Sequence, residues 1–286
     1  MWKAEGVGAV EVEGLTFSFG ITPVLRGLDL VVERGSTLTI FGPNGAGKTT
    51  LLKVLAGLLV PTQGSVRIEG MDAMKTPTAL RRLIGLISHQ TYLYPQLTGR
   101  ENLEFYGRMY RVADPRREAR SMLEQMGLAT VMDREVNTYS RGMQQRLSIA
   151  RALLHRPRVL LLDEPFTGLD HQARGSLASL LGTVGDEERT VIMATHDIDE
   201  GLGLSDRVAV LVRGKLALET GAPPWERAAF LARYRETVAG DGGDASSGSG
   251  DGGGGSEGGG GSGDDRSGDG GSGDGGPAAR GEVPPA

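Results

Sequence analysis

The sequence predicts an α/β fold, in which a β-rich N-terminal lobe leads into a core built on a buried sheet. Three observations support this prediction. A glycine-rich loop, 42–49, lies between a strand-like segment, 37–41, and a helix-like segment, 50–56. A continuous apolar run at 159–164 ends in two carboxylates, which is typical of a parallel strand buried on both faces. Alternating apolar residues at 10–19 indicate strands before the loop.

Composition divides the chain into a body and a tail. Residues 241–286 are mostly Gly, Ser and Asp without apolar periodicity, and such a segment buries too little surface to offset its ordering entropy. We therefore expect one folded domain at 1–240 and a disordered tail after it. The tail carries nine acidic and two basic residues, which leaves the body near charge balance. That balance argues neither for nor against a nucleic-acid partner.

Composition also limits the chemistry and the compartment. The chain has no cysteine, so a disulfide framework and cysteine-based metal sites are excluded. No apolar run approaches the length of a membrane span, and the N-terminus lacks the apolar core of a signal peptide. We expect a soluble, cytoplasmic protein.

The N-terminal segment is predicted to form strands, and two of its aromatic residues can be interpreted in two ways. After the alternation at 10–19, further strands are expected at 28–32 and 64–70, with a turn at 20–23. The ring of Phe19 is suited to stack on an adenine base. Taken alone, however, the pattern is better explained if Phe17 or Phe19 is simply a core residue.

The loop after the strand at 37–41 has the composition of a phosphate-binding loop. Its pattern is G-x-x-x-x-G-K-[ST], and the required strand and helix flank it. Glycines let the backbone N–H groups turn inward toward phosphate oxygens, and the following helix adds the positive end of its dipole. Lys48 is expected to reach the β- and γ-phosphates, and the Thr49 hydroxyl to bind Mg²⁺. A chance glycine-rich turn is the alternative. The predicted nucleotide ligands here are Gly42, Pro43, Asn44, Gly45, Ala46, Gly47, Lys48, Thr49 and Thr50.

A helical insert is expected between two core strands, at about 91–155. The apolar run at 84–90 reads as a strand that ends at Gln90, which would ligate Mg²⁺ or position a water; an ordinary loop amide is the alternative. The pattern at 98–125 is helical, with a new helix starting at Asp114 because a proline follows it.

A second helix start has the features of an anion site. Ser140 and Gly142 precede a long helical pattern that runs to Leu154. The N–H groups at such a helix start can bind a phosphate, although an ordinary serine N-cap explains Ser140 equally well. Two anion-binding helix starts in one chain make the first interpretation worth testing.

Acidic and histidine side chains are expected where two buried strands end. The run at 159–163 places Asp163 and Glu164 beside the phosphate loop, because parallel strands end at the same edge of a sheet. Asp163 can hold Mg²⁺, and Glu164 can activate the water that attacks the γ-phosphate. The strand at 190–195 precedes His196, which either bonds the γ-phosphate or the water, or is a satisfied core histidine.

The end of the body is predicted to contain a hairpin and a helix. The run at 207–216 reads as a hairpin-like pair of strands. Phe230, Tyr234 and Val238 recur every four residues, which indicates a short amphipathic helix that packs on the body.

Taken in order, these motifs resemble the nucleotide-binding subunit of an ATP-binding cassette (ABC) transporter over about residues 9–220. They comprise the aromatic residue Phe19, the Walker A motif GPNGAGKT, Gln90, the signature region YSRGMQQ, the Walker B motif LLLDEP, the D-loop TGLD and His196. The resemblance implies a P-loop NTPase with a RecA-like core, an antiparallel β lobe and a helical subdomain. It also implies Mg²⁺-dependent ATP hydrolysis.

The resemblance further implies site residues and partners. Glu164 matches the catalytic base, Lys48 and His196 complete the catalytic set, and Asp170 of the D-loop lies at the nucleotide. In this family two subunits meet head to tail, with each ATP between one Walker A loop and the partner's signature. The expected partners are a second ATP-binding subunit, forming a homodimer, and separate transmembrane permease subunits at the inner face of the cell membrane. No nucleic acid is expected.

The signature departs from the usual LSGGQ. Tyr139, Arg141 and Met143 replace its first, third and fifth residues, while Ser140 and Gly142 are kept. The SRGM form, with LYPQLTGRENL after Gln90, is similar to ABC-2-type exporters, including haem exporters of cytochrome c maturation, multidrug exporters and sodium exporters.

Two other classes of ABC ATPase are alternatives. Translation factors usually carry two cassettes, and DNA-repair members carry a long coiled coil between the Walker A motif and the signature; neither feature occurs here. A non-hydrolysing regulator is disfavoured because Lys48, Asp163, Glu164 and His196 are all present.

Overall fold

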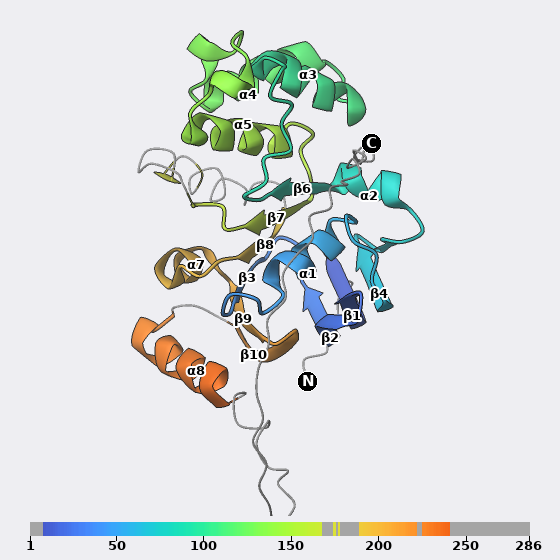
Figure 1. Cartoon of the computed structure of the whole chain (residues 1–286), viewed down its shortest axis with the longest axis vertical. Helices are drawn as coiled ribbons and strands as arrows, with labels where there is room; N and C mark the ends of the chain where they lie inside the picture. Colours follow the sequence, from blue (N-terminus) through green and yellow to red (C-terminus); the bar gives the residue numbers. More distant parts are fainter. Residues whose placement is uncertain (1–7, 168–173, 176, 178–188, 222–224, 241–286) are drawn as a thin grey trace, which may run out of the picture. The chain divides into compact units, whose positions relative to one another are not determined.

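The computed structural model describes residues 8–167, 174–175, 177, 189–221 and 225–240. Within them the chain forms two sheets, of four and six strands, with helices packed around the larger one (Figure 1). This arrangement confirms the predicted α/β fold with an antiparallel β lobe. The expected tail and Asp170 of the predicted D-loop lie outside the described residues.

The smaller sheet is antiparallel and has the strand order β2-β1-β4-β5. Its first hairpin turns at Gly20, where φ is +57°, and Phe19 pairs with Thr22 directly after the turn. The second strand therefore begins at residue 22, earlier than the expected 28, because the tight turn lets pairing start at once. The strands are β1 (Val10–Phe19), β2 (Thr22–Val32), β4 (Gln63–Ile68) and β5 (Met71–Asp72).

The larger sheet has the order β10-β9-β3-β8-β7-β6, and every neighbouring pair in it is parallel except β10 with β9. Every residue of β7 and β8 is buried, as expected for strands covered on both faces. The parallel strands end at one edge of the sheet, so the segments that follow them meet there. The strands are β3 (Thr37–Phe41), β6 (Ile84–Ile87), β7 (Val159–Asp163), β8 (Thr190–Ala194), β9 (Arg207–Val212) and β10 (Lys215–Gly221).

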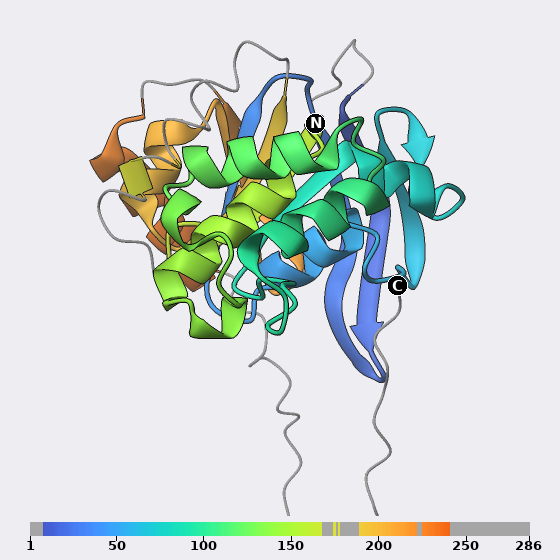
Figure 2. The same cartoon turned by 90° about the horizontal axis from the view of Figure 1, so that it is seen from above.

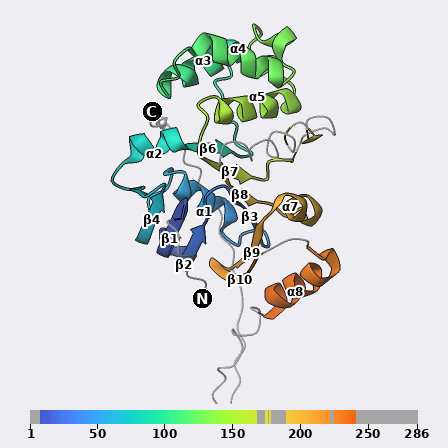
Figure 3. The same cartoon turned by 180° about the vertical axis from the view of Figure 1, so that it is seen from behind.

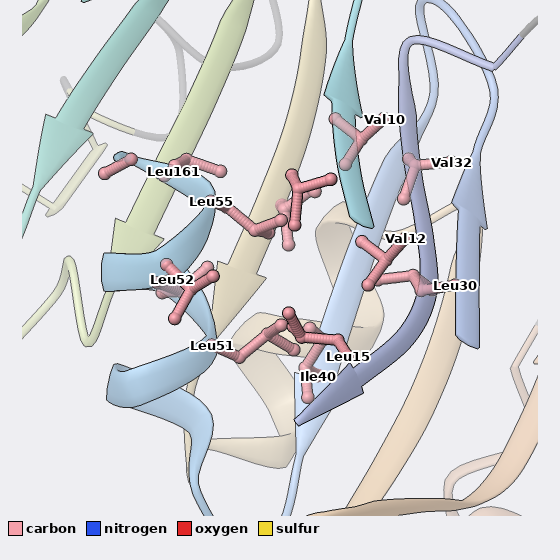
Figure 4. Packing of buried hydrophobic residues seen from close by; sticks show 14 of the residues in the cluster. Val10, Val12, Leu15, Leu30, Val32, Ile40, Leu51, Leu52, Leu55 and Leu161 are labelled. Carbon is pink, nitrogen blue, oxygen red and sulfur yellow. The ribbon is translucent and has the colours of Figure 1, made fainter. Parts of the chain in front are cut away.

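Alternate residues of β7 belong to two different cores. Leu161 packs in the cluster that contains helix α1 (Lys48–Leu55) and the antiparallel sheet (Figure 4). Leu160 and Leu162 pack in the cluster that contains helix α5 (Arg141–Leu153). Because successive side chains of a strand point to opposite faces, α1 and α5 cover opposite faces of the six-stranded sheet.

The insert between β6 and β7 is helical, as predicted (Figure 2). The single pattern at 98–125 forms two helices, α3 (Gly99–Met109) and α4 (Pro115–Gln125). Thr98 and Glu101 form a capping box at the first, and the Asp114 carboxylate accepts from the Arg117 N–H at 3.1 Å at the second. Two short 3₁₀ turns, Ala129–Val131 and Val136–Thr138, precede α5.

Among the described residues, two short α-helices were not predicted: α2 (Pro77–Leu83) and α7 (Ile198–Leu204). Each has only two turns, so its apolar periodicity is too short to recognise. The predicted final helix is present as α8 (Arg227–Gly240; Figure 3). The ring of its Phe230 lies 5.1 Å from the ring of Phe41, centre to centre. None of the helices in the described ranges has the length and apolar character needed to cross a membrane.

Candidate functional site

The phosphate loop leaves β3 at the edge where the parallel strands end. A Cβ at Gly42 would lie 2.2 Å from the carbonyl oxygen of Leu211 on the neighbouring strand, so no other residue fits there. Gly47 has φ of +108°, and a Cβ there would lie 3.0 Å from a methyl group of Leu25. The two glycines allow the loop to turn tightly against β2 and β9, which leaves Asn44 and Gly45 exposed at its tip.

Lys48 begins α1 and directs its side chain back under the loop. Its Nζ donates to the carbonyl oxygens of Gly42 at 2.6 Å and Pro43 at 3.2 Å. Burial lowers the pKa of Lys48, while the nearby Glu164 and Asp163 carboxylates raise it. A buried ammonium group inside a loop of N–H donors is suited to bind phosphate oxygens.

Thr49 joins the start of α1 to the end of β7. Its hydroxyl donates to both carboxylate oxygens of Asp163, at 3.0 and 2.9 Å. Burial raises the pKa of Asp163, and the Thr49 hydrogen bond acts in the opposite direction. A hydroxyl and a carboxylate are hard oxygen ligands that suit Mg²⁺. The described residues contain no group of three or more His, Asp or Glu ligands, so a Mg²⁺ ion here would take its other ligands from phosphate and water.

Glu164 follows β7 and is held by the residues that follow β8. Its backbone N–H donates to Ala194 at 2.9 Å, and its φ is +51°, which is unusual for a residue with a side chain. One carboxylate oxygen lies 2.8 Å from Nδ1 of His196, and the other accepts from the Thr195 hydroxyl at 3.3 Å. The Glu164 side chain is 26% exposed and that of His196 70%, so both groups can meet a solvent water or a ligand.

The structure corrects the expected end of β6. The strand ends at Ile87 rather than at Gln90, because residues 88–90 turn and the Ser88 hydroxyl donates to the Gln90 carbonyl at 2.8 Å. The Gln90 side chain is exposed and makes no hydrogen bond to any described residue. Its neighbour His89 lies beside Asp163, with Nδ1 3.8 Å from a carboxylate oxygen.

The two aromatic residues of β1 lie two positions apart, on the same side of the strand, but they differ in exposure. Phe17 is buried, whereas Phe19 is 57% exposed and meets the Phe17 ring edge-on at 4.8 Å. The core alternative therefore holds for Phe17 and not for Phe19, which is the last residue of β1, next to the turn at Gly20. Its free face is suited to stacking on a base.

The predicted second anion site lies at the start of α5. The Ser140 hydroxyl accepts from the Met143 N–H at 3.3 Å, and a Cβ at Gly142 would meet no atom within 4 Å. Ser140 is exposed, so its side chain and the open side of Gly142 both face outward. The unusual Tyr139 is buried instead, and its hydroxyl donates to Val131 at 2.7 Å.

The structure thus brings together some predicted residues and separates others. Lys48, Thr49, Asp163, Glu164 and His196 lie at one edge of the larger sheet. Ser140 and Gly142 begin a helix on the face opposite α1. Thr195 and His89 also lie at the site, and the sequence motifs do not single them out; the signal for each is its position beside a predicted site residue.

Comparison with known proteins agrees with this geometry. The family model described as ABC transporter matches residues 25–167. The chain is 38% identical over 213 residues to the daunorubicin resistance ATP-binding protein DrrA3 of Streptomyces coeruleorubidus, which covers 74% of this chain and 67% of that protein. It is 35% identical over 201 residues to the ABC transporter ATP-binding protein NatA of Bacillus subtilis (strain 168), which covers 68% of this chain and 81% of NatA.

The fold also matches solved cassettes. A dimeric post-hydrolysis structure of the ATP-binding cassette MJ0796, bound to ADP and Pi, superposes with a TM-score of 0.70 at 29% identity and covers 76% of this chain and all of that one. A second structure of MJ0796 is also dimeric, so dimers with bound nucleotide are known for this fold. The chain belongs to the ABC transporter family, as an ATP-binding subunit that hydrolyses ATP.

Proposed function

We propose that the chain drives an ABC-2-type exporter through Mg²⁺-dependent ATP hydrolysis with Glu164 as general base. The observation that carries this proposal is the pairing of Glu164 with His196, 2.8 Å apart, at the edge where Lys48 and Thr49 lie. A carboxylate fixed by two neighbours is placed to accept a proton from a water.

The other predicted residues take complementary roles. Phe19 stacks on the adenine, and the N–H groups of the loop at 42–50 bind the phosphates together with Lys48. Thr49 and Asp163 hold Mg²⁺, with Gln90 reaching the ion when its exposed side chain turns inward. The bound ion neutralises phosphate charge, and His196 donates to the γ-phosphate or orients the water.

The site is completed by a second copy of the chain in a head-to-tail homodimer. Ser140, Gly142 and Asp170 would belong to the nucleotide of the partner subunit. The support is geometric: Lys48 and Ser140 start helices that cover opposite faces of one sheet.

The exporter assignment is supported by the SRGM signature and by the drug-resistance function in the name of DrrA3. It implies separate permease subunits, with the chain held against the inner face of the membrane. Body residues 1–240 would be the catalytic domain, with its helical subdomain at about 91–155. Copurification with a multi-spanning membrane protein tests this assignment against translation and DNA-repair ATPases, which should bring down ribosomes or DNA instead.

The surface expected to contact the permease lies on α3 and the loop before it. Three apolar side chains are exposed there: Tyr94 by 44%, Phe105 by 41% and Met109 by 47%. The Tyr94 and Phe105 rings meet at 5.0 Å. The loop is held by Asn102, which is fully buried; its side chain accepts from the Tyr94 N–H at 2.8 Å and donates to the Tyr94 carbonyl at 3.0 Å.

Phe105→Ser should uncouple transport from hydrolysis. It removes exposed apolar surface that a partner would bury, so we expect loss of transport and of permease copurification, with ATP binding unchanged. Arg120→Ser on α4 is the matched exposed control. Glu101→Lys is a poor probe, because the Glu101 carboxylate accepts from the Thr98 N–H at 2.8 Å and its loss would weaken the helix cap by about 1 kcal/mol. Normal transport by Phe105→Ser would place the permease contact elsewhere.

Residues 241–286 should be dispensable for catalysis. They are polar, acidic and without apolar pattern, so they can bury little surface against the domain. A chain that ends at Gly240 should hydrolyse ATP at a rate within about two-fold of the full chain. A folded truncation without ATPase activity would instead show that the tail has a regulatory role.

A further inference from the structure

One buried charge plays no part in the proposed chemistry. Arg151 lies on α5, the helix that begins at Ser140, and only 5% of it is exposed. No carboxylate in the described part of the chain forms an ion pair with it. A buried cation without an anion is costly and is retained only where other contacts compensate.

The compensating contacts come from the strand and loop that lead to Gln90. Arg151 donates from Nη2 to the carbonyl of Leu86 on β6, at 2.6 Å. Its Cζ lies 5.6 Å from the centre of the Tyr92 ring and 5.4 Å from that of Tyr106, which is the range of cation–π attraction. Its Nε is buried without a hydrogen-bond partner among the described residues.

Two further hydrogen bonds hold the same loop. The Ser148 hydroxyl, three residues before Arg151 and on the same face of α5, donates to the Thr91 carbonyl at 3.3 Å. The Tyr106 hydroxyl of α3 donates to the Tyr92 carbonyl. Tyr92 has φ of +54°, a conformation that a residue with a side chain keeps only where its surroundings hold it.

We propose that Arg151 is a positioning residue that fixes the loop carrying Gln90 to the helix carrying Ser140. The inference rests on the proposed function: in the head-to-tail dimer Gln90 faces the chain's own nucleotide, whereas Ser140 faces the nucleotide of the partner subunit. A contact that makes the loop and α5 move together therefore links the two ATP sites through one chain.

Arginine suits this role because its planar group can lie against two rings and still donate to a carbonyl. Methionine has similar length and no charge. Replacing buried charged groups by apolar residues of similar volume is often neutral or stabilising when no charged partner is left behind, and Arg151 has no carboxylate partner among the described residues. Arg151→Met should therefore fold, with a melting temperature equal to or above that of the parent, while the attachment to Leu86 and the rings is lost.

The test uses the full chain in a Glu164→Gln background, so that ATP is retained. ATP binding is measured at protein concentrations too low for dimers, and ATP-induced dimerisation is measured by sedimentation. Arg151→Met should leave the affinity of the monomer for ATP within about two-fold of the parental value. It should raise the ATP concentration needed for half-maximal dimerisation by about ten-fold, which is an ordinary size for coupling between sites. The control is Arg146→Met on the same helix, which loses a 3.2 Å bond to Met126 but none to the loop.

The outcomes separate this inference from the proposed function. Dimerisation of Arg151→Met at the parental ATP concentration would overturn the inference, whereas a parent that never dimerises with ATP would overturn the proposed shared site. Arg151→Lys keeps the charge without the planar group and should be intermediate. If Arg151→Met does not fold, the second variant is Tyr106→Phe, which keeps the ring and removes only the hydroxyl that holds Tyr92. If Tyr106→Phe dimerises at the same ATP concentration as the parent, that result would also count against the inference.

Discussion

Glu164→Gln is expected to bind ATP as tightly as the wild-type chain and to hydrolyse it about 10²- to 10⁴-fold more slowly, the range for loss of a general base. Glutamine keeps the size of the side chain and can still bond Thr195. It cannot accept a proton from water. Turnover should therefore fall while the phosphate loop, Lys48 and Thr49 remain intact.

The measurement is steady-state phosphate release together with equilibrium binding of ATP by the purified protein. Glu200→Gln is the matched control, since it changes the same kind of side chain on α7, where Glu200 pairs with Arg174 rather than with His196. Lys48→Ala should instead weaken ATP binding itself, because the ammonium group that binds the phosphates is lost. Near-normal turnover by Glu164→Gln would remove Glu164 from the role of base.

Mixed dimers of Lys48→Ala and Ser140→Arg chains are expected to recover ATP-dependent closure that neither homodimer shows. Each homodimer carries its own defect in both sites. In a mixed dimer one site collects both defects, and the other combines an intact Lys48 with an intact Ser140. The cause is the two-fold arrangement, in which each chain contributes opposite halves to two equivalent sites.

Closure is measured by ATP-dependent sedimentation or cross-linking of chains with two different tags, and hydrolysis is the second readout. ATP stabilises the closed dimer because it binds both halves only there. A mixture of Lys48→Ala with Lys48→Ala under another tag is the control, since it has no intact site. If mixed dimers form and neither closure nor hydrolysis returns, the shared site is wrong.

Local sequence determined most of the elements that carry the site. The predicted strand at 37–41 is β3 residue for residue, and the apolar run to Asp163 is a fully buried strand. Asp114 and Ser140 cap helices as expected. These features are local: a buried strand, a glycine-rich turn and an N-cap each depend on residues a few positions apart.

The positions of Phe19 and Gln90 needed tertiary information. Phe17 and Phe19 share one side of β1, so alternation alone does not show that the core covers Phe17 and ends before Phe19. The strand before Gln90 ended at Ile87 because a turn, held by Ser88, replaced pairing with β7.

By itself, the sequence determined the identity of the phosphate-binding loop and of the acidic strand end, because each is defined by residue types at short fixed spacing. Only the tertiary structure decided that His196 and Thr195 hold Glu164, that α1 and α5 lie on opposite faces of the sheet, and that Arg151 sits between two rings. The Thr195–Glu164 and Arg151–Leu86 hydrogen bonds join residues 31 and 65 positions apart. Strand order and packing, rather than local pattern, bring such segments together.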